Sequence, residues 1–147
     1  MANLEALYQE TILEHNRRPR NFRELEHATG HAEGRNPLCG DQVTVWVRVE
    51  GDRVAEVTFH GQGCAISKAS ASLMTAAIAG KTREETNAVF DRFHAMVTGK
   101  EPGDASLGSL RALGGVSKYP IRVKCATLAW HAMKAALDGD SNAISTE

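Results

Sequence analysis

The sequence lacks the features that mark membrane-spanning, secreted and nucleic-acid-binding proteins. No apolar stretch approaches the ~18–20 residues that a membrane span requires. The first eight residues show no basic region followed by an apolar run, so we expect no secretory signal and a place in the reducing cytoplasm. The formal net charge is −1, from 17 basic and 18 acidic residues, which argues against a nucleic-acid partner. We therefore expect neither a membrane nor a nucleic acid among the partners.

Cysteine is also scarce, with three residues, at positions 39, 64 and 125. An odd number of cysteines excludes a closed disulfide framework within one monomer. A chain of 147 residues fits one domain, which can bury a stable core without disulfides. Metal ligation or thiol chemistry is therefore the better explanation for the cysteines.

The apolar pattern predicts one α+β domain over residues 1–147, with a small antiparallel three-stranded sheet packed against several helices. Residues 43–49 place a valine at every second position, which is typical of a half-buried strand. A turn at Gly51-Asp52 extends this strand into a β-hairpin over residues 42–60. Residues 28–33 are expected to add a short edge strand.

Helices are predicted where apolar residues recur every three or four positions. They comprise an N-terminal helix that ends at Pro19, a helix between Gly63 and Gly80, one capped by Thr82 and ended by Gly99, a short one over Leu107–Leu113, and one from about Lys124 to Leu137. Residues 140–147 are expected to form a frayed tail. The predicted strands therefore come early in the chain and the helices come mostly late.

Each cysteine lies at the edge of a predicted element, where side chains from distant parts of a sequence can converge. Cys39 precedes the hairpin, Cys64 follows its second strand, and Cys125 stands at the start of the last helix. The positive end of a helix dipole stabilises a thiolate. Cys64 and Cys125 are both expected to gain from this effect.

Three thiolates and one more donor would complete a tetrahedral zinc site, and Asp41 is the best fourth candidate. It lies two residues from Cys39, and Gly40 between them allows the backbone to curl. Four negative ligands exceed the charge of zinc, so nearby cations are expected to offset the difference. The candidate cations are Arg122, Lys124 and Lys68.

A plainer interpretation is that the cysteines are small buried hydrophobic residues. The glycines beside them argue against it, because Gly40, Gly61 and Gly63 cost backbone entropy that a packing site does not require. The six histidines show no spacing that predicts a second metal site. Trp46 and Trp130 are expected to be packing anchors.

Three motifs surround the cysteines in order. They are Asn36-Pro-Leu-Cys-Gly-Asp41, Gly61-Gln-Gly-Cys-Ala-Ile-Ser67 and Arg122-Val-Lys-Cys-Ala-Thr-Leu-Ala-Trp130. Together they resemble the U-type iron–sulfur cluster assembly proteins, the family of IscU and of the N-terminal part of NifU. The resemblance covers nearly the whole chain. Lys124 stands where the IscU-type branch has a histidine, and the segment between the second and third cysteines is longer, as in the SufU-type branch.

This resemblance implies a zinc-dependent sulfurtransferase that takes persulfide sulfur from a PLP-dependent cysteine desulfurase of the SufS type. It implies zinc on Cys39, Asp41, Cys64 and Cys125, with Cys39 as the sulfur acceptor and Arg122 in a supporting role. Downstream iron–sulfur scaffold proteins are further implied partners. An alternative is a scaffold on which an iron–sulfur cluster is assembled and passed on, because thiolates suit iron as well as zinc. A structural zinc domain that docks other proteins is a third hypothesis.

Overall fold

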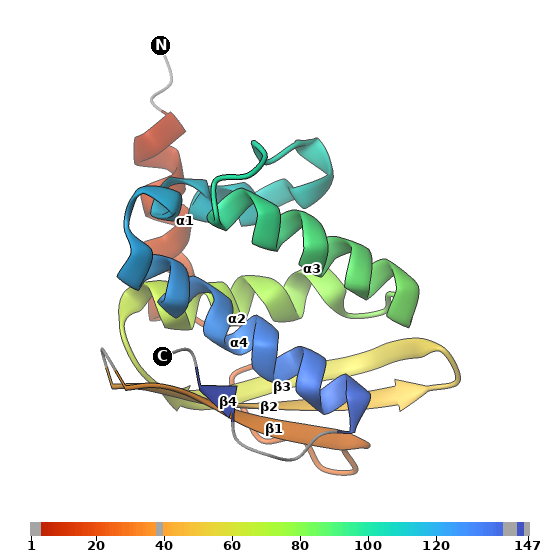
Figure 1. The fold of residues 1–147 in the computed structure, drawn as a ribbon. Coiled ribbons are helices and arrows are strands. Elements are labelled where there is room, and N and C mark those ends of the chain that lie inside the picture. Colours follow the sequence, from red (N-terminus) through yellow and green to blue (C-terminus); the bar gives the residue numbers. More distant parts are fainter. Residues whose placement is uncertain (1–3, 38–39, 140–143, 146–147) are drawn as a thin grey trace.

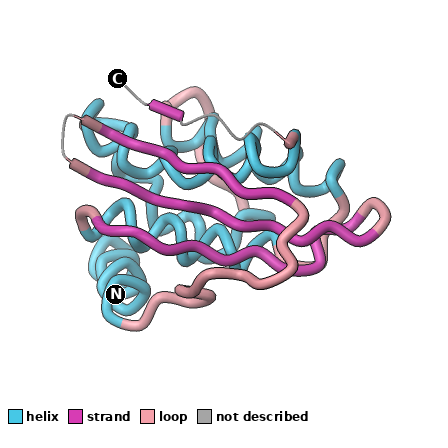
Figure 2. The backbone as a smooth tube through the Cα atoms, turned by 90° about the horizontal axis from the view of Figure 1, so that it is seen from below, coloured by secondary structure: helices cyan, strands magenta, loops and turns pink. Residues whose placement is uncertain are grey.

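A computed structural model describes residues 4–37, 40–139 and 144–145 as a sheet covered on one face by helices (Figure 1). Viewed from below, the strands lie in front and all the helices lie behind them (Figure 2). This arrangement confirms the predicted α+β class. Among the described residues, one face of the sheet is therefore free of helices, and the helix-covered face holds the core.

Three antiparallel strands form most of the sheet: β1 (Gly30–Asn36), β2 (Asp41–Glu50) and β3 (Arg53–Gln62). The predicted three-stranded antiparallel sheet is confirmed. A two-residue strand, β4 (Ile144–Ser145), adds to it by pairing in parallel with β1, which gives the order β3-β2-β1-β4. Along β2 the valines at 43, 45 and 47 are buried toward the helices, as their alternation predicted.

Two predictions about the edges of the sheet were wrong. The edge strand expected over residues 28–33 runs instead from Gly30 to Asn36 and pairs with β2 along its full length. The frayed tail expected over 140–147 does not hold for Ile144–Ser145, because these residues form β4. Residues 140–143 and 146–147 lie outside the described part of the chain.

In the part of the chain that the structure describes, four α-helices and one irregular 3₁₀ segment follow the predicted order. They are α1 (Leu4–Arg17), α2 (Ala65–Ile78), α3 (Arg83–Val97), η1 (Ala105–Lys118) and α4 (Pro120–Asp138). The capping box predicted for α3 is present, since Thr82 and Glu85 each bond the other's backbone N–H. The helix ends predicted at Gly80, Gly99 and Gly139 coincide with left-handed backbone at these glycines.

The predicted boundaries of the last two helical segments were wrong. The short helix expected over Leu107–Leu113 extends as 3₁₀ turns from Ala105 to Lys118, with a break at Gly108 where φ is 53°. The last helix begins at Pro120 and not near Lys124. Proline has no N–H to donate, and the first turn of a helix does not need one, so Pro120 starts the helix.

Helix α4 lies very close to β1, and two glycines allow this. A Cβ atom on Gly30 would collide with the carbonyl oxygen of Ala136, and one on Gly34 would lie 3.0 Å from Leu128 Cδ1. α4 also contacts β2 and α2, so it links the sheet to α2. The close approach brings the first turns of α4 over the end of β1 where the β1–β2 connection begins.

Candidate metal centre

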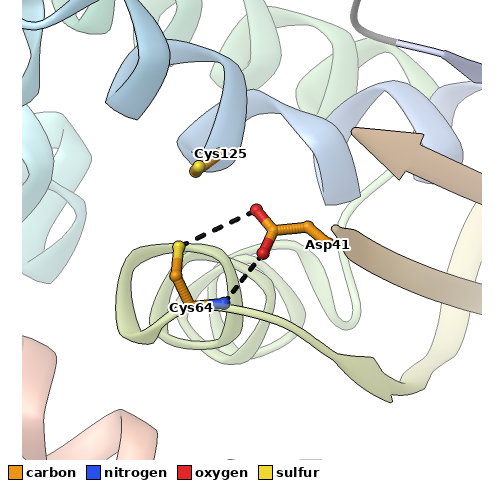
Figure 3. Close-up of side chains that lie close together, drawn as sticks. All are labelled: Asp41, Cys64 and Cys125. Carbon is orange, nitrogen blue, oxygen red and sulfur yellow. Dashed lines mark hydrogen bonds between the residues drawn. The ribbon is translucent and has the colours of Figure 1, made fainter. Parts of the chain in front are cut away.

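Three of the four predicted zinc ligands come together at one end of the sheet. The ligand atoms of Asp41, Cys64 and Cys125 all lie within 4.8 Å of one another. Figure 3 shows the three side chains pointing toward one another from β2, the start of α2 and α4. Cys39, the fourth predicted ligand, lies outside the described residues. The three residues come from segments far apart in the sequence, so the fold itself creates this group.

Asp41 is the first residue of β2 and is only 2% exposed. It shares the inner face of the sheet with the buried valines, because strand residues alternate between faces. Its Oδ1 atom accepts a hydrogen bond from the backbone N–H of Cys64 at 2.8 Å. A Cβ atom on Gly63 would lie 2.9 Å from Asp41 Cγ, so only glycine at position 63 leaves room for this carboxylate.

Cys64 is the N-cap residue of α2, which confirms its predicted position at a helix start. Its Sγ atom accepts a hydrogen bond from the backbone N–H of Ser67 at 3.4 Å. Its thiol lies 3.7 Å from Asp41 Oδ2 and donates to it. The side chain is partly exposed, whereas Asp41 and Cys125 are buried. The N-terminal end of α2 therefore directs positive partial charge at the sulfur, as a thiolate would require.

Cys125 does not stand at a helix start, and that prediction was wrong. It lies in the second turn of α4, five residues after Pro120, where backbone N–H groups are already bonded within the helix. The side chain is 3% exposed. The side-chain amide of Asn36 donates to Cys125 Sγ, with an Nδ2 to Sγ distance of 3.7 Å. A buried side chain therefore provides Cys125 with the kind of donor that a backbone N–H provides for Cys64.

A buried polar contact fixes α2 against α4 beside the group. The hydroxyl of Ser70 donates to the carbonyl oxygen of Ala126 at 2.5 Å and accepts from Trp130 Nε1 at 3.1 Å. The indole of Trp130 is fully buried and stacks on Phe93 with ring centroids 4.3 Å apart. Trp130 is therefore the packing anchor that was predicted, and it holds in place the two helices that carry Cys64 and Cys125.

Two of the three cations proposed to offset the ligand charge, Arg122 and Lys68, make contacts with aromatic rings. The guanidinium of Arg122 lies over the ring of Tyr119, 4.6 Å from its centroid, and Lys68 Nζ lies 4.8 Å from the centroid of Phe22. Both are cation–π contacts of ordinary geometry. The supporting role of Arg122 stays a prediction.

Sequence reasoning missed two features that the fold creates. One is the contact from Asn36 to Cys125, between residues 89 positions apart. The other is a pair of histidines, His94 on α3 and His131 on α4, whose ring centroids lie 6.0 Å apart. Burial lowers the pKa of His131 below its usual value of 6.5, and the neighbouring His94 and Lys134 lower it further. No sequence spacing links either pair.

The donor set fits zinc. Two sulfurs and a carboxylate already lie close enough to bind one ion, and zinc binds thiolate and carboxylate ligands in a tetrahedral arrangement. Three donors leave one tetrahedral position, and Cys39 is the remaining cysteine, two residues before Asp41. Within the described residues this is the one group of three or more histidine, cysteine or acidic residues with metal-binding spacing.

Comparison with known proteins identifies the family. The model of the NifU-like N-terminal domain matches residues 7–139. A protein of Bacillus subtilis (strain 168) named zinc-dependent sulfurtransferase SufU is 44% identical over 134 residues, which cover 90% of this chain and 90% of that protein. One of Streptococcus pyogenes serotype M1 named iron–sulfur cluster assembly scaffold protein IscU is 40% identical over 144 residues, covering 97% of this chain and 90% of its own length.

The fold has solved counterparts as well. A crystal structure from Fervidobacterium islandicum AW-1, described as a scaffold candidate of the SUF system for iron–sulfur cluster assembly, superposes with a TM-score of 0.82. That chain is 35% identical, and the match covers 92% of this chain and 99% of that one. The chain therefore belongs to the NifU-like N-terminal domain family, together with proteins named IscU and SufU. No helix in the described residues has the combined length and apolarity for crossing a bilayer.

Proposed function

We propose that this chain is a zinc-dependent sulfurtransferase that accepts persulfide sulfur from a cysteine desulfurase for iron–sulfur cluster assembly. The observation that carries the proposal is the meeting of Asp41, Cys64 and Cys125 within 4.8 Å. The 44% identity to a protein named zinc-dependent sulfurtransferase SufU supports the same conclusion. Zinc would be held by these three residues and Cys39, and it would keep the thiols deprotonated as thiolates.

The four residues take different parts in this proposal. Cys64 and Cys125 are anchoring residues, because each belongs to a helix fixed by the Ser70 contact and each sulfur accepts an N–H group. Asp41 is anchored by the backbone of Cys64. Cys39 is the sulfur acceptor in this proposal, as the family resemblance implies, and it is the remaining cysteine, two residues before Asp41 in the sequence.

The transfer step needs no oxidant or reductant. The thiolate of Cys39 attacks the outer sulfur of a persulfide on the desulfurase, and a new sulfur–sulfur bond forms on Cys39. The sulfur–sulfur bond of the donor breaks, and its electron pair leaves with the donor cysteine as a thiolate. One sulfur atom has then moved, and the total number of sulfur–sulfur bonds is unchanged.

Trapping of the persulfide tests this proposal. The zinc-loaded protein is mixed with a PLP-dependent cysteine desulfurase of the SufS type and L-cysteine, quenched with an alkylating reagent and digested for mass spectrometry. The extra sulfur is expected on the peptide that contains Cys39, and Cys39→Ser is expected to abolish it. Ser117→Ala, a substitution in η1, is the control and should carry the sulfur as the original chain does. Sulfur found on Cys64 or Cys125, or on no peptide at all, would refute the assignment.

Cluster assembly is the second candidate function. The 40% identity to a protein named iron–sulfur cluster assembly scaffold protein IscU favours it, and the same donor set suits iron. Anaerobic incubation with ferrous iron, cysteine and the desulfurase separates the two candidates. A sulfurtransferase should retain stoichiometric zinc and stay colourless, whereas a scaffold should develop the visible absorption of a cluster and pass it to an apo-ferredoxin.

A further inference from the structure

Asn36 is a buried polar residue placed directly beside the candidate ligands. It is the last residue of β1 and is 0% exposed. In the sheet it stands opposite Asp41, and directly paired residues of antiparallel strands project to the same face. Its backbone carbonyl also accepts the N–H of Gly40 at 2.9 Å, which closes the connection that contains Cys39. Asn36 therefore touches the site through both its backbone and its side chain.

The side chain of Asn36 reaches the sulfur of Cys125, a candidate ligand on another element. Its Nδ2 atom lies 3.7 Å from Cys125 Sγ. Asp41 and Cys64 accept hydrogen bonds from the backbone N–H groups of Cys64 and Ser67, which are not used in a helix or strand ladder. The N–H groups around Cys125 lie in the second turn of α4 and are used inside the helix. The amide of Asn36 supplies this sulfur with a donor from another element.

Burial makes this contact informative. An amide group removed from water is costly unless it is hydrogen-bonded, and an apolar residue of similar size would fill the same space. The buried amide and its hydrogen bond to Cys125 therefore indicate a role beyond packing. Such outer partners fix the orientation of a ligand and tune its basicity in other metal sites.

We infer that Asn36 is a positioning residue for the metal centre: its amide donates an N–H to Cys125 Sγ and keeps this thiolate as a permanent ligand. The inference rests on the proposed function only in that it uses the same metal site. Asn36 fixes the side-chain rotamer of Cys125 and withdraws electron density from its sulfur. Because its backbone also closes the connection to Asp41, one residue couples the fixed ligand on α4 to the segment that carries Cys39.

Metal binding without any partner enzyme tests this inference. Asn36→Leu keeps most of the buried volume and removes the donor, while Asn36→Ala removes it without crowding. Thr58→Val is the matched control, because Thr58 is also fully buried in the sheet but its hydroxyl has no hydrogen-bond partner in the described chain. Zinc affinity is measured by competition with a chromophoric chelator. Cobalt(II) is then substituted to record the sulfur-to-metal charge-transfer band.

Both Asn36 variants are expected to bind zinc about 10–100-fold more weakly than the original chain, the usual cost of losing an outer partner of a ligand. Their cobalt band should move to lower energy, because a thiolate without an N–H donor gives up its electrons more easily. Thr58→Val should change neither value. Circular dichroism of each protein establishes folding, and Asn36→Ala decides the question if the leucine variant does not fold.

Unchanged zinc affinity and an unmoved cobalt band in the Asn36 variants would overturn the inference and leave Asn36 a packing residue. Sulfur transfer does not enter these measurements. If the variants lose affinity as expected but the original chain accepts no sulfur, the positioning role stands and the proposed function fails. If the original chain binds neither zinc nor cobalt, both are wrong.

Discussion

The carboxylate of Asp41 accepts a hydrogen bond from the backbone N–H of Cys64 at 2.8 Å. This contact joins the first residue of β2 to the N-cap of α2, so two candidate ligands 23 positions apart share one bond. The second carboxylate oxygen faces the thiol of Cys64 at 3.7 Å. Asp41 therefore has two separable roles, one in the fold through Oδ1 and one toward a metal through its charge.

Asp41→Asn is expected to separate these roles. Its amide oxygen can still accept from Cys64, so the variant should fold, but it loses the negative charge that a zinc ligand contributes. Zinc affinity measured by chelator competition should fall more than the about 10–100-fold that loss of an outer partner costs. Asp52→Asn, in the exposed turn of the β2–β3 hairpin, is the control and should bind zinc normally. Full zinc retention by Asp41→Asn would remove Asp41 from the ligand set.

Gly63→Ala is expected to weaken metal binding although it replaces none of the candidate ligands. The new Cβ would lie 2.9 Å from Asp41 Cγ and would force the carboxylate away from Cys64. Gly115→Ala is the matched control, because a Cβ there meets nothing within 4 Å. Zinc per chain, measured by elemental analysis after dialysis, should drop for the first variant and stay stoichiometric for the second. Equal zinc content in both variants would show that zinc binding does not depend on the present position of the Asp41 carboxylate.

Ser70→Ala is expected to destabilise the contact between α2 and α4. Trp130 Nε1 would lose its acceptor in a fully buried place, which costs about 1–3 kcal/mol of unfolding free energy. Thr58→Val should be nearly neutral, because its hydroxyl has no partner in the described chain to lose. Urea unfolding of the metal-free proteins measures both. A Ser70 variant as stable as the original chain would mean that the hydroxyl does not hold the helices together.

Stability is expected to fall as the pH drops below about 6.5, with His131 as one cause. Burial is the main reason that the pKa of His131 lies below 6.5 in the folded protein, and His94 and Lys134 add to it. The unfolded chain therefore takes up a proton first as the pH falls. The stabilising contribution is complete above about pH 6.5 and is lost between that pH and the folded-state pKa.

His131→Gln should flatten this pH dependence, because glutamine does not titrate. Urea unfolding of the metal-free protein from pH 7.5 to pH 5 measures the slope, and a chelator keeps proton release by metal ligands out of the result. A variant with a slope as steep as that of the original chain would assign the effect to other groups.

Local signals made much of the fold predictable. The capping box of Thr82 and Glu85 depends on residues three positions apart, and the valine alternation of β2 depends on neighbours, so both were predicted. The start of the last helix at Pro120 was missed, because proline both ends and begins helices and only the tertiary structure distinguishes these uses. The strand Ile144–Ser145 has two residues, too few for any periodic pattern.

In the candidate site, too, local features could be read from the sequence and distant contacts could not. The glycines beside Cys64 argued against a plain packing site, and the structure shows Gly61 lying against Gln42 and Gly63 against Asp41. The donor to Cys125 was not predictable, because Asn36 is 89 residues away and no spacing links the two. The packing of α4 on the sheet brings Asn36 and Cys125 together. No pattern in the sequence alone predicts this contact.

Zinc K-edge X-ray absorption of the zinc-loaded protein tests the central claim most directly, since it counts the ligands by element. The account predicts three sulfurs at about 2.3 Å and one oxygen at about 2.0–2.2 Å. Cys39→Ser should reduce the sulfur count to two, while Ser117→Ala should leave it at three. A zinc environment made only of nitrogen and oxygen, or a sulfur count that does not change in Cys39→Ser, would contradict the account.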